Sequence, residues 1–321
     1  MAAAVVLTAG IFVALSGAGA AAPAPPPAVA GPATARPAAA SAPPAASAAP
    51  STRSPRPTPP AVRVPGLIGA IGDSLTVAVN ADGAFGDQPE HSWIVGDAPD
   101  DGVASHLERL RAFGADPDVT TAAMPGAAVA TAPGQAATVV EAAARLPPGA
   151  TAYVTFELGA NDICAASLAD ATDVDAFAAA VGSAFGALSD GLPSGSVLVV
   201  LSVPDVTRLR TLLEDVPRAQ ELHRRYGVCR AVLGEAVAPA AVHDRIRAYN
   251  GILAAACKGL DESSLDCRFD LAGEPSGSLF GAVFGLDELS SLDFFHPSLA
   301  GQARIADEVW PLTPWAGAAA P

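Results

Sequence analysis

The sequence predicts an α/β fold in which one mostly parallel sheet is covered by helices on both faces. From about Val64 onward, short apolar runs alternate with segments whose apolar residues recur at helical spacing. The apolar runs do not alternate cleanly between apolar and polar residues, which is typical of strands buried on both faces. Alternation of strands with helices favours right-handed crossovers within a single parallel sheet.

Five strands and four main helices follow from these patterns. The first helix is rich in alanine and ends before Pro147, and the second carries Asp173 and Asp175 near its positive N-terminal end. The expected strands are Leu67–Ile71, Val119–Ala123, Ala152–Leu158, Ser196–Val203 and Cys267–Phe269, and the expected helices cover 134–146, 173–190, 241–259 and 298–309.

Two short segments carry the residues of a hydrolytic site. Gly72-Asp73-Ser74-Leu75 comes directly after the first expected strand, where ligand sites of parallel sheets gather. A serine hydroxyl needs a base and a group that orients that base, and Asp293 and His296 stand three residues apart near the C-terminal end. The sequence therefore predicts Ser74 as nucleophile, His296 as base and Asp293 as the orienting acid.

Two further loops are candidates for donors to an oxyanion. Gly126 ends the loop Thr121-Ala122-Ala123-Met124-Pro125-Gly126, and its backbone N–H lacks a shielding side chain. Asn161 lies in Leu158-Gly159-Ala160-Asn161-Asp162, just after the third expected strand, and offers a side-chain amide. Taken alone, these loops could equally be a turn glycine and an ordinary Asn/Asp turn.

Taken in order, these four segments resemble the SGNH/GDSL hydrolase family. The resemblance covers the chain from Ile71 to Ser298. It implies a flavodoxin-like three-layer α/β/α fold with a five-stranded sheet, and an oxyanion hole made by the N–H of Ser74, the N–H of Gly126 and the side chain of Asn161. The second segment of the family usually opens with asparagine, where this chain has Thr121.

Other features look closer to the phospholipase B-like branch of that family. They are Ser92-Trp93 followed by Gly96-Asp97, Pro125-Gly126-Ala127, the cysteine directly after Asn161-Asp162-Ile163, and Phe294-Phe295-His296-Pro297-Ser298. The other histidines, His91, His106, His223 and His243, are interpreted as ordinary surface or internally bonded side chains.

The N-terminal region is expected to lie outside the folded domain. Residues 1–22 carry no charge and hold a short apolar run that ends in small residues, which favours a secretory signal peptide. Because no basic residue precedes the run, an uncleaved N-terminal anchor remains the alternative. Residues 23–63 consist mostly of Ala, Pro, Ser and Thr and are expected to form a disordered linker, followed by one catalytic domain over 64–315.

Four cysteines in an exported chain favour disulfides, and three connectivities are open. Cys257 and Cys267 are near neighbours and would close a small loop, which leaves Cys164 to pair with Cys229. Zinc is disfavoured because the chain has no C-x-x-C spacing.

The combined interpretation is a secreted serine esterase or lipase that hydrolyses lipid or phospholipid carboxylic esters through an acyl-enzyme. The alternatives are a carbohydrate O-acetylesterase with the same triad and a catalytically inactive surface-binding protein. No metal or cofactor is expected. With 33 acidic against 18 basic residues and a net charge of −15, nucleic acid is an unfavourable partner. We expect a monomer that acts on a small-molecule or lipid ester, with association to the cell envelope only through the N-terminal segment.

Overall fold

In the part of the chain that the structure describes, five parallel strands form one sheet. The computed structural model describes residues 63–317, apart from 235–237, 261–264, 271–278 and 280. The strand order is β2-β1-β3-β4-β5, with every neighbouring pair parallel, which confirms the predicted α/β fold and its flavodoxin-like order. The strands are β1 (Leu67–Gly72), β2 (Asp118–Thr121), β3 (Ala152–Glu157), β4 (Val197–Val200) and β5 (Asp266–Phe269).

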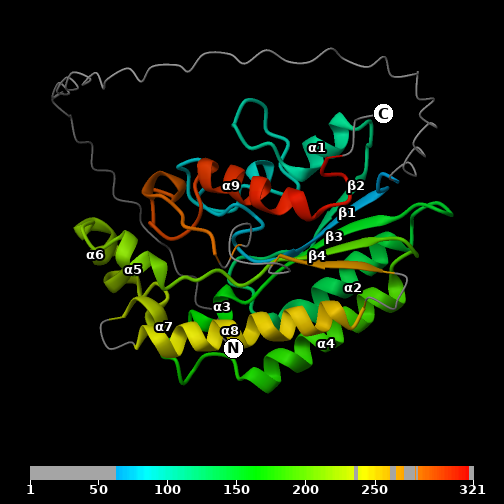
Figure 1. The fold of residues 1–321 in the computed structure, drawn as a ribbon. Coiled ribbons are helices and arrows are strands. Elements are labelled where there is room, and N and C mark those ends of the chain that lie inside the picture. The colour runs from blue at the N-terminus through cyan, green and yellow to red at the C-terminus, as the bar shows by residue number, and fades with distance from the viewer. Residues whose placement is uncertain (1–62, 235–237, 261–264, 271–278, 280, 318–321) are drawn as a thin grey trace, which may run out of the picture. The chain divides into compact units, whose positions relative to one another are not determined.

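Three long helices cover one face of the sheet (Figure 1). They are α2 (Ala132–Ala143), α4 (Val174–Gly191) and α8 (Pro239–Lys258). Strand side chains such as Val154 and Phe156 pack with Val139, Phe185 and Leu253 in one buried cluster. The Asp173 side chain caps α4 by accepting the N–H groups of Asp175 and Ala176, so its position before the helix in sequence has a direct structural role.

The opposite face is covered by α1 (His106–Ala112) and α9 (Leu299–Val309) (Figure 1). Here the alternate strand residues, including Ile68 and Val199, pack against Leu110 and Ile305. Because successive side chains of a strand point to opposite faces, the short runs without polar alternation fill both cores.

His106 is buried within this second core. Its Nδ1 lies 2.7 Å from the Tyr153 hydroxyl and its Nε2 lies 3.0 Å from the Ala306 carbonyl oxygen. The carbonyl can only accept, so Nε2 carries the proton and Nδ1 accepts from tyrosine. Burial lowers the pKa of His106 to about 3, so this histidine is a neutral packing residue.

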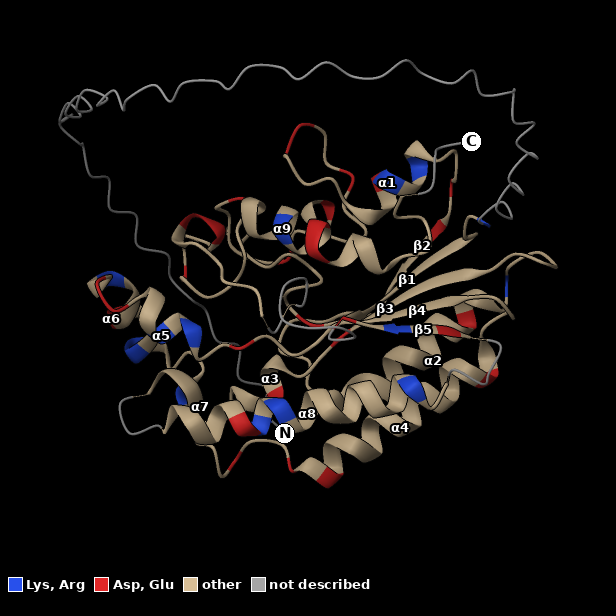
Figure 2. Cartoon of the chain, in the orientation of Figure 1, with Lys and Arg blue, Asp and Glu red and all other residues tan. Residues whose placement is uncertain are grey.

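The four predicted helices exist, with bounds shifted by a few residues at most, while several shorter elements were not predicted. A helical insertion lies between β4 and β5 and consists of α5 (Arg208–Leu212), α6 (Pro217–Tyr226) and α7 (Arg230–Leu233), whose arginines are blue in Figure 2. The other elements that were not predicted are α1, α3 (Ala160–Ile163) and the 3₁₀ turns Pro89–His91, Val129–Thr131, Leu286–Glu288 and Trp310–Leu312.

The edge strand β2 is mostly exposed, whereas the sequence predicted a strand that is buried on both faces. Three of its four residues are exposed, and Val119 is 42% exposed. Its sequence, Asp-Val-Thr-Thr, has few large apolar side chains to bury, in contrast with the fully buried strands β1, β3 and β4.

Two disulfides join elements on the α8 side of the domain. Cys164, directly after α3, is bonded to Cys229, and Cys257 of α8 is bonded to Cys267 of β5. This is the pairing named from the sequence.

None of the helices in the described part of the chain is long and apolar enough to cross a membrane. The expected signal peptide and linker, at 1–63, lie almost wholly outside the described residues.

Removing either disulfide should destabilise the domain by a loop-dependent amount. The chain-entropy relation gives about 4 kcal/mol for the 65-residue separation of Cys164 and Cys229, and about 3 kcal/mol for the 10-residue separation of Cys257 and Cys267. Paired Cys→Ala variants measured by urea unfolding test these values. Mass spectrometry of non-reduced peptides tests the pairing itself, and a Cys164–Cys257 link in the oxidised protein would contradict it.

Candidate active site

The predicted site residues come from loops at the carboxyl ends of β1, β2 and β3 and from the loop before α9. The strand order changes direction at β1, which has β2 on one side and β3 on the other. Parallel α/β sheets hold their ligand sites beyond the carboxyl ends of the strands at such a point.

The turn after β1 requires glycine at position 72. A Cβ atom added to Gly72 would lie 2.1 Å from the Thr76 Oγ1 and 3.1 Å from the Glu157 carbonyl oxygen. The same residue is held by Gln135, whose side chain accepts the Gly72 N–H at 2.8 Å and donates to its carbonyl at 3.1 Å. The turn therefore leaves the strand in a fixed direction, and Ser74 follows two residues later.

Ser74 begins a helical turn and is mostly buried, with 5% exposure. Its carbonyl oxygen accepts the Val79 N–H at 3.0 Å. Within the described part of the chain, neither its backbone N–H nor its Oγ takes part in a hydrogen bond. Both groups therefore remain available to a bound molecule.

Asp293 and His296 form a directly bonded pair. The Asp293 Oδ1 accepts the backbone N–H groups of Phe295, at 2.9 Å, and of His296, at 3.0 Å. Its Oδ2 lies 2.7 Å from Nδ1 of the His296 ring. Because a carboxylate only accepts, Nδ1 is the donor, and Nε2 is left as the basic nitrogen of the neutral ring.

A second donor fixes the same carboxylate. The Asn80 Nδ2 donates to the Asp293 Oδ2 at 2.6 Å. Burial tends to raise the pKa of Asp293, but the hydrogen bonds and charge of His296 together with the Asn80 amide outweigh it and hold that pKa below its usual value. Asp293 therefore stays ionised at neutral pH and favours a positive charge on the ring beside it.

The loop that carries His296 is bonded to the turn that carries Ser74. Besides the Asn80–Asp293 bond, the Ser290 Oγ donates to the Asn80 carbonyl at 2.7 Å, and the Gln302 Nε2 donates to the Leu75 carbonyl at 3.0 Å. A positive charge on His296 would also lower the pKa of Asp73, the neighbour of Ser74. The structure thus brings the two segments together, but no hydrogen bond joins the Ser74 Oγ to His296. Such bonds are often formed only when substrate is present.

Gly126 lies in the loop after β2 and adopts a left-handed backbone, with φ of +73°. An added Cβ would meet nothing within 4 Å, so this conformation, and not crowding, favours glycine here. No hydrogen bond within the described residues uses its N–H. It is therefore a second available backbone donor.

Asn161 lies in α3, directly after β3, and its amide already has two partners. Its Nδ2 donates to the Asp73 Oδ2 at 2.9 Å and to the Ala127 carbonyl at 3.0 Å. An NH₂ group has two hydrogens. Donation to a third acceptor therefore requires that one of these bonds be shared or exchanged.

Two buried carboxyl groups, those of Glu157 and Asp73, lie at the turn that carries Ser74. Glu157, the last residue of β3, accepts the N–H of Asp73 at 3.2 Å and the Thr76 hydroxyl at 3.0 Å. Burial and the neighbouring Asp73 charge raise the pKa of Glu157 well above its usual value, and burial raises that of Asp73 to about 6. The Asp73 carboxylate in turn accepts the side-chain amide of Asn161 at 2.9 Å.

The comparison with known protein families covers these same segments. Residues 68–309 match the family described as GDSL-like lipase/acylhydrolase. The chain belongs to the GDSL-like lipase/acylhydrolase family. It is accordingly a carboxylic ester hydrolase. No curated protein matches the chain in sequence.

Solved structures similar to this GDSL family member share low sequence identity with it. TesA is 19% identical, with a TM-score of 0.43, over 77% of this chain and 97% of TesA. The extracellular lipase of Streptomyces rimosus is 15% identical, with a TM-score of 0.43, over 77% of this chain and 99% of the lipase. The esterase EstA from Pseudoalteromonas sp. is 15% identical, with a TM-score of 0.40, over 77% and 96% of the two chains.

Three residues of this GDSL hydrolase have site contacts that its sequence did not predict. Asn80 binds the Asp293 carboxylate, the His223 Nε2 of α6 lies 2.8 Å from the Asp293 carbonyl oxygen, and Glu157 supports Asp73. Asn80 and His223 lie 213 and 70 residues from Asp293 along the chain, so only the fold reveals them. The described residues include no group of three His, Cys, Asp or Glu side chains arranged to hold a metal ion.

Proposed function

We propose that this hydrolase works through an acyl-enzyme formed on Ser74. The Ser74 Oγ attacks the ester carbonyl carbon while His296 Nε2 takes the hydroxyl proton. The ring then gives that proton to the alcohol oxygen as the bond between acyl carbon and alcohol breaks. Water repeats the attack with His296 as base, which releases the acid and restores Ser74.

The remaining site residues stabilise the charges that develop during these steps. Asp293 orients the ring and stabilises the imidazolium without accepting its proton. The N–H groups of Ser74 and Gly126 donate to the oxyanion, and Asn161 joins them by giving up or sharing its bond to Asp73. Support for this proposal comes above all from the Asp293–His296 bond in a loop that is tied by hydrogen bonds to the serine turn.

A phosphonate ester with a nitrophenolate leaving group tests the proposed nucleophile directly. Attack by the Ser74 Oγ displaces nitrophenolate and leaves a stable phosphonyl adduct, because the tetrahedral phosphorus resembles the intermediate of acyl transfer. Peptide mass spectrometry should place one adduct per chain on the peptide that contains Ser74. Labelling of another serine, with activity lost at the same rate, would contradict the proposal.

Asn161→Ala should mainly lower kcat. Losing one side-chain donor to an oxyanion typically costs about 10²–10³ in kcat. A loss confined to KM would assign the amide to ground-state binding. Since Asn161 also bonds Asp73 and Ala127, a melting curve of the variant separates a catalytic loss from a loosened loop.

Asn80→Gly should impair catalysis while keeping the local backbone. Asn80 has a φ of +60°, which glycine adopts without strain, so this variant removes the donor to Asp293 without straining the backbone, together with the Oδ1 that accepts the Gly86 N–H at 2.9 Å. A hydrogen bond to a charged group is worth about 1.5–3 kcal/mol, so we expect kcat to fall by roughly 10- to 100-fold with KM nearly constant. Asn80→Asp, which also tolerates positive φ, should be at least as severe because a second carboxylate would face Asp293. Unchanged kcat in Asn80→Gly would limit Asn80 to a structural role.

We also propose that the chain acts outside the cytoplasm. Two disulfides without a remaining free cysteine support this location, because structural disulfides persist in oxidising compartments. Fractionation of expressing cells, with the oxidation state of the four cysteines read in each fraction, tests it.

A further inference from the structure

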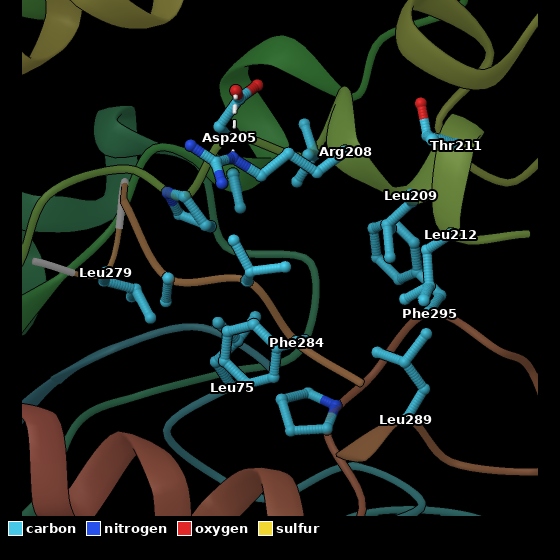
Figure 3. A pocket seen from close by; sticks show the side chains of 16 residues that line it. Leu75, Asp205, Arg208, Leu209, Thr211, Leu212, Leu279, Phe284, Leu289 and Phe295 are labelled. Carbon is cyan, nitrogen blue, oxygen red and sulfur yellow. Dashed lines mark hydrogen bonds and ion pairs between the residues drawn. The ribbon is translucent and has the colours of Figure 1, made fainter. Parts of the chain in front are cut away.

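One cavity opens at the carboxyl edge of the sheet, beside the proposed triad. Its volume is about 480 Å³. Its walls come from the loops that follow β1, β3 and β4, from helix α5 of the insertion and from the loop before α9. Figure 3 shows Leu75, Leu209, Leu212, Leu289 and Phe295 around the open space.

The described residues that line this cavity are almost all apolar. Of sixteen, only Asp205, Arg208 and Thr211 are polar, which leaves thirteen apolar side chains. The Asp205 carboxylate is paired internally, since it accepts from Thr207 and lies 3.4 Å from the Arg208 Nε and 3.3 Å from the His243 Nδ1. A sugar requires several convergent hydrogen-bonding groups, whereas this lining suits an aliphatic chain.

The cavity borders the immediate neighbours of the proposed catalytic residues. Leu75 follows Ser74, and Phe295 and Pro297 stand on the two sides of His296. Ala160 precedes Asn161. A group attached to the reacting carbonyl carbon would therefore meet the cavity within a few bonds of Ser74.

We propose that this cavity binds the acyl chain of the substrate and that the hydrolase prefers medium or long aliphatic acyl groups over acetyl. This inference rests on the proposed acyl-enzyme at Ser74. An engineered apolar cavity of roughly 150 Å³ holds benzene, so a cavity about three times as large has room for an aliphatic chain of roughly ten carbons. Leu209 and Leu212 of α5 form the wall that is farthest in sequence from the catalytic segments. These two side chains set the length of acyl chain that the cavity accepts.

A series of nitrophenyl esters from acetate to decanoate, kept below their aggregation concentrations, measures this preference. Burial of one methylene corresponds to about fourfold in affinity. We expect kcat/KM to rise with each added methylene and to be at least about 100-fold higher for octanoate than for acetate. A flat or falling series contradicts the proposal and favours a small acyl group such as acetyl.

Filling the cavity should weaken the preference for longer acyl groups. In Leu209→Trp and Leu212→Trp the ratio of kcat/KM for octanoate to that for acetate should fall by about tenfold or more, the scale at which pocket size discriminates chains. The ratio is insensitive to a general loss of active enzyme. Leu222→Trp is the matched control, because Leu222 is also half-buried in the same helical insertion but does not line the cavity. An equal effect on all three variants would contradict the assignment.

Two further measurements separate this inference from the proposed function. Acetate esters of alcohols of increasing length test whether the cavity takes the alcohol instead. A preference that follows alcohol length and not acyl length overturns the acyl assignment.

Calorimetric titration of Ser74→Ala with decanoate and with acetate needs no turnover. We expect decanoate alone to bind and Leu212→Trp to weaken it by about tenfold. Failure of decanoate to bind contradicts the cavity assignment even if Ser74 is the nucleophile, and binding without Ser74-dependent turnover contradicts only the proposed mechanism.

Discussion

Ser74→Ala should lower kcat by about 10⁴–10⁶, because removal of one member of a serine triad costs nearly as much as removal of all of them. The residual rate would come from the oxyanion donors and from substrate binding. Stability should change little, since the Ser74 Oγ takes part in no hydrogen bond within the described residues. Burst kinetics with nitrophenyl esters, the mark of an accumulating acyl-enzyme, should disappear together with steady-state turnover.

Ser92→Ala is a matched control for this variant. Ser92 is fully buried, and its Oγ donates to the Thr76 carbonyl at 2.6 Å. Loss of this hydrogen bond should lower the free energy of unfolding by about 1–3 kcal/mol, while kcat stays within a few-fold of the wild-type value. The two serines are thus expected to separate stability from catalysis. A Ser74→Ala protein that keeps a tenth of the wild-type kcat would remove the central claim about the nucleophile.

The sequence predicts those parts of the site that lie close together along the chain. Asp293 and His296 share one turn, and Ser74 directly follows a strong apolar strand. The fold class is predictable for a related reason: buried strands and long helices repeat a pattern over many residues, so β1, β3 and α4 lie within a few residues of their expected bounds.

What the sequence does not predict depends on tertiary contacts. The short helices α5 and α7 carry too few residues for a helical pattern to be distinctive, yet α5 forms a wall of the cavity. Asn80 adopts a left-handed backbone and reaches Asp293 across the fold, and no local pattern marks it. The double use of the Asn161 amide is equally invisible, because it depends on where Asp73 and Ala127 lie.

Asp293→Asn should lower kcat by about 10³–10⁴, and His296→Ala should be at least as severe. The geometry gives the reason. The two backbone N–H groups that reach Oδ1 of Asp293 hold the oxygen of the substituted amide at that position. Its NH₂ then replaces Oδ2 and points at Nδ1 of His296, which must become an acceptor. The ring proton moves to Nε2, the nitrogen that has to accept the proton of Ser74, and the donor Asn80 meets a second donor.

The pH dependence of kcat/KM separates the roles of the two residues. Because the pKa of Asp293 is lowered in the folded protein, its pairing with His296 contributes stability above the unfolded value of 3.8 and loses it as the pH falls through the lower folded value. Asp293 should therefore add no limb to the profile between pH 5 and 8, the range in which histidine ordinarily changes charge. A nearly silent Asp293→Asn beside an inactive His296→Ala would mean that another group, such as a backbone carbonyl, orients the ring. The site would then be a Ser74–His296 dyad, and the short Asp293–His296 bond would serve only to shape the loop.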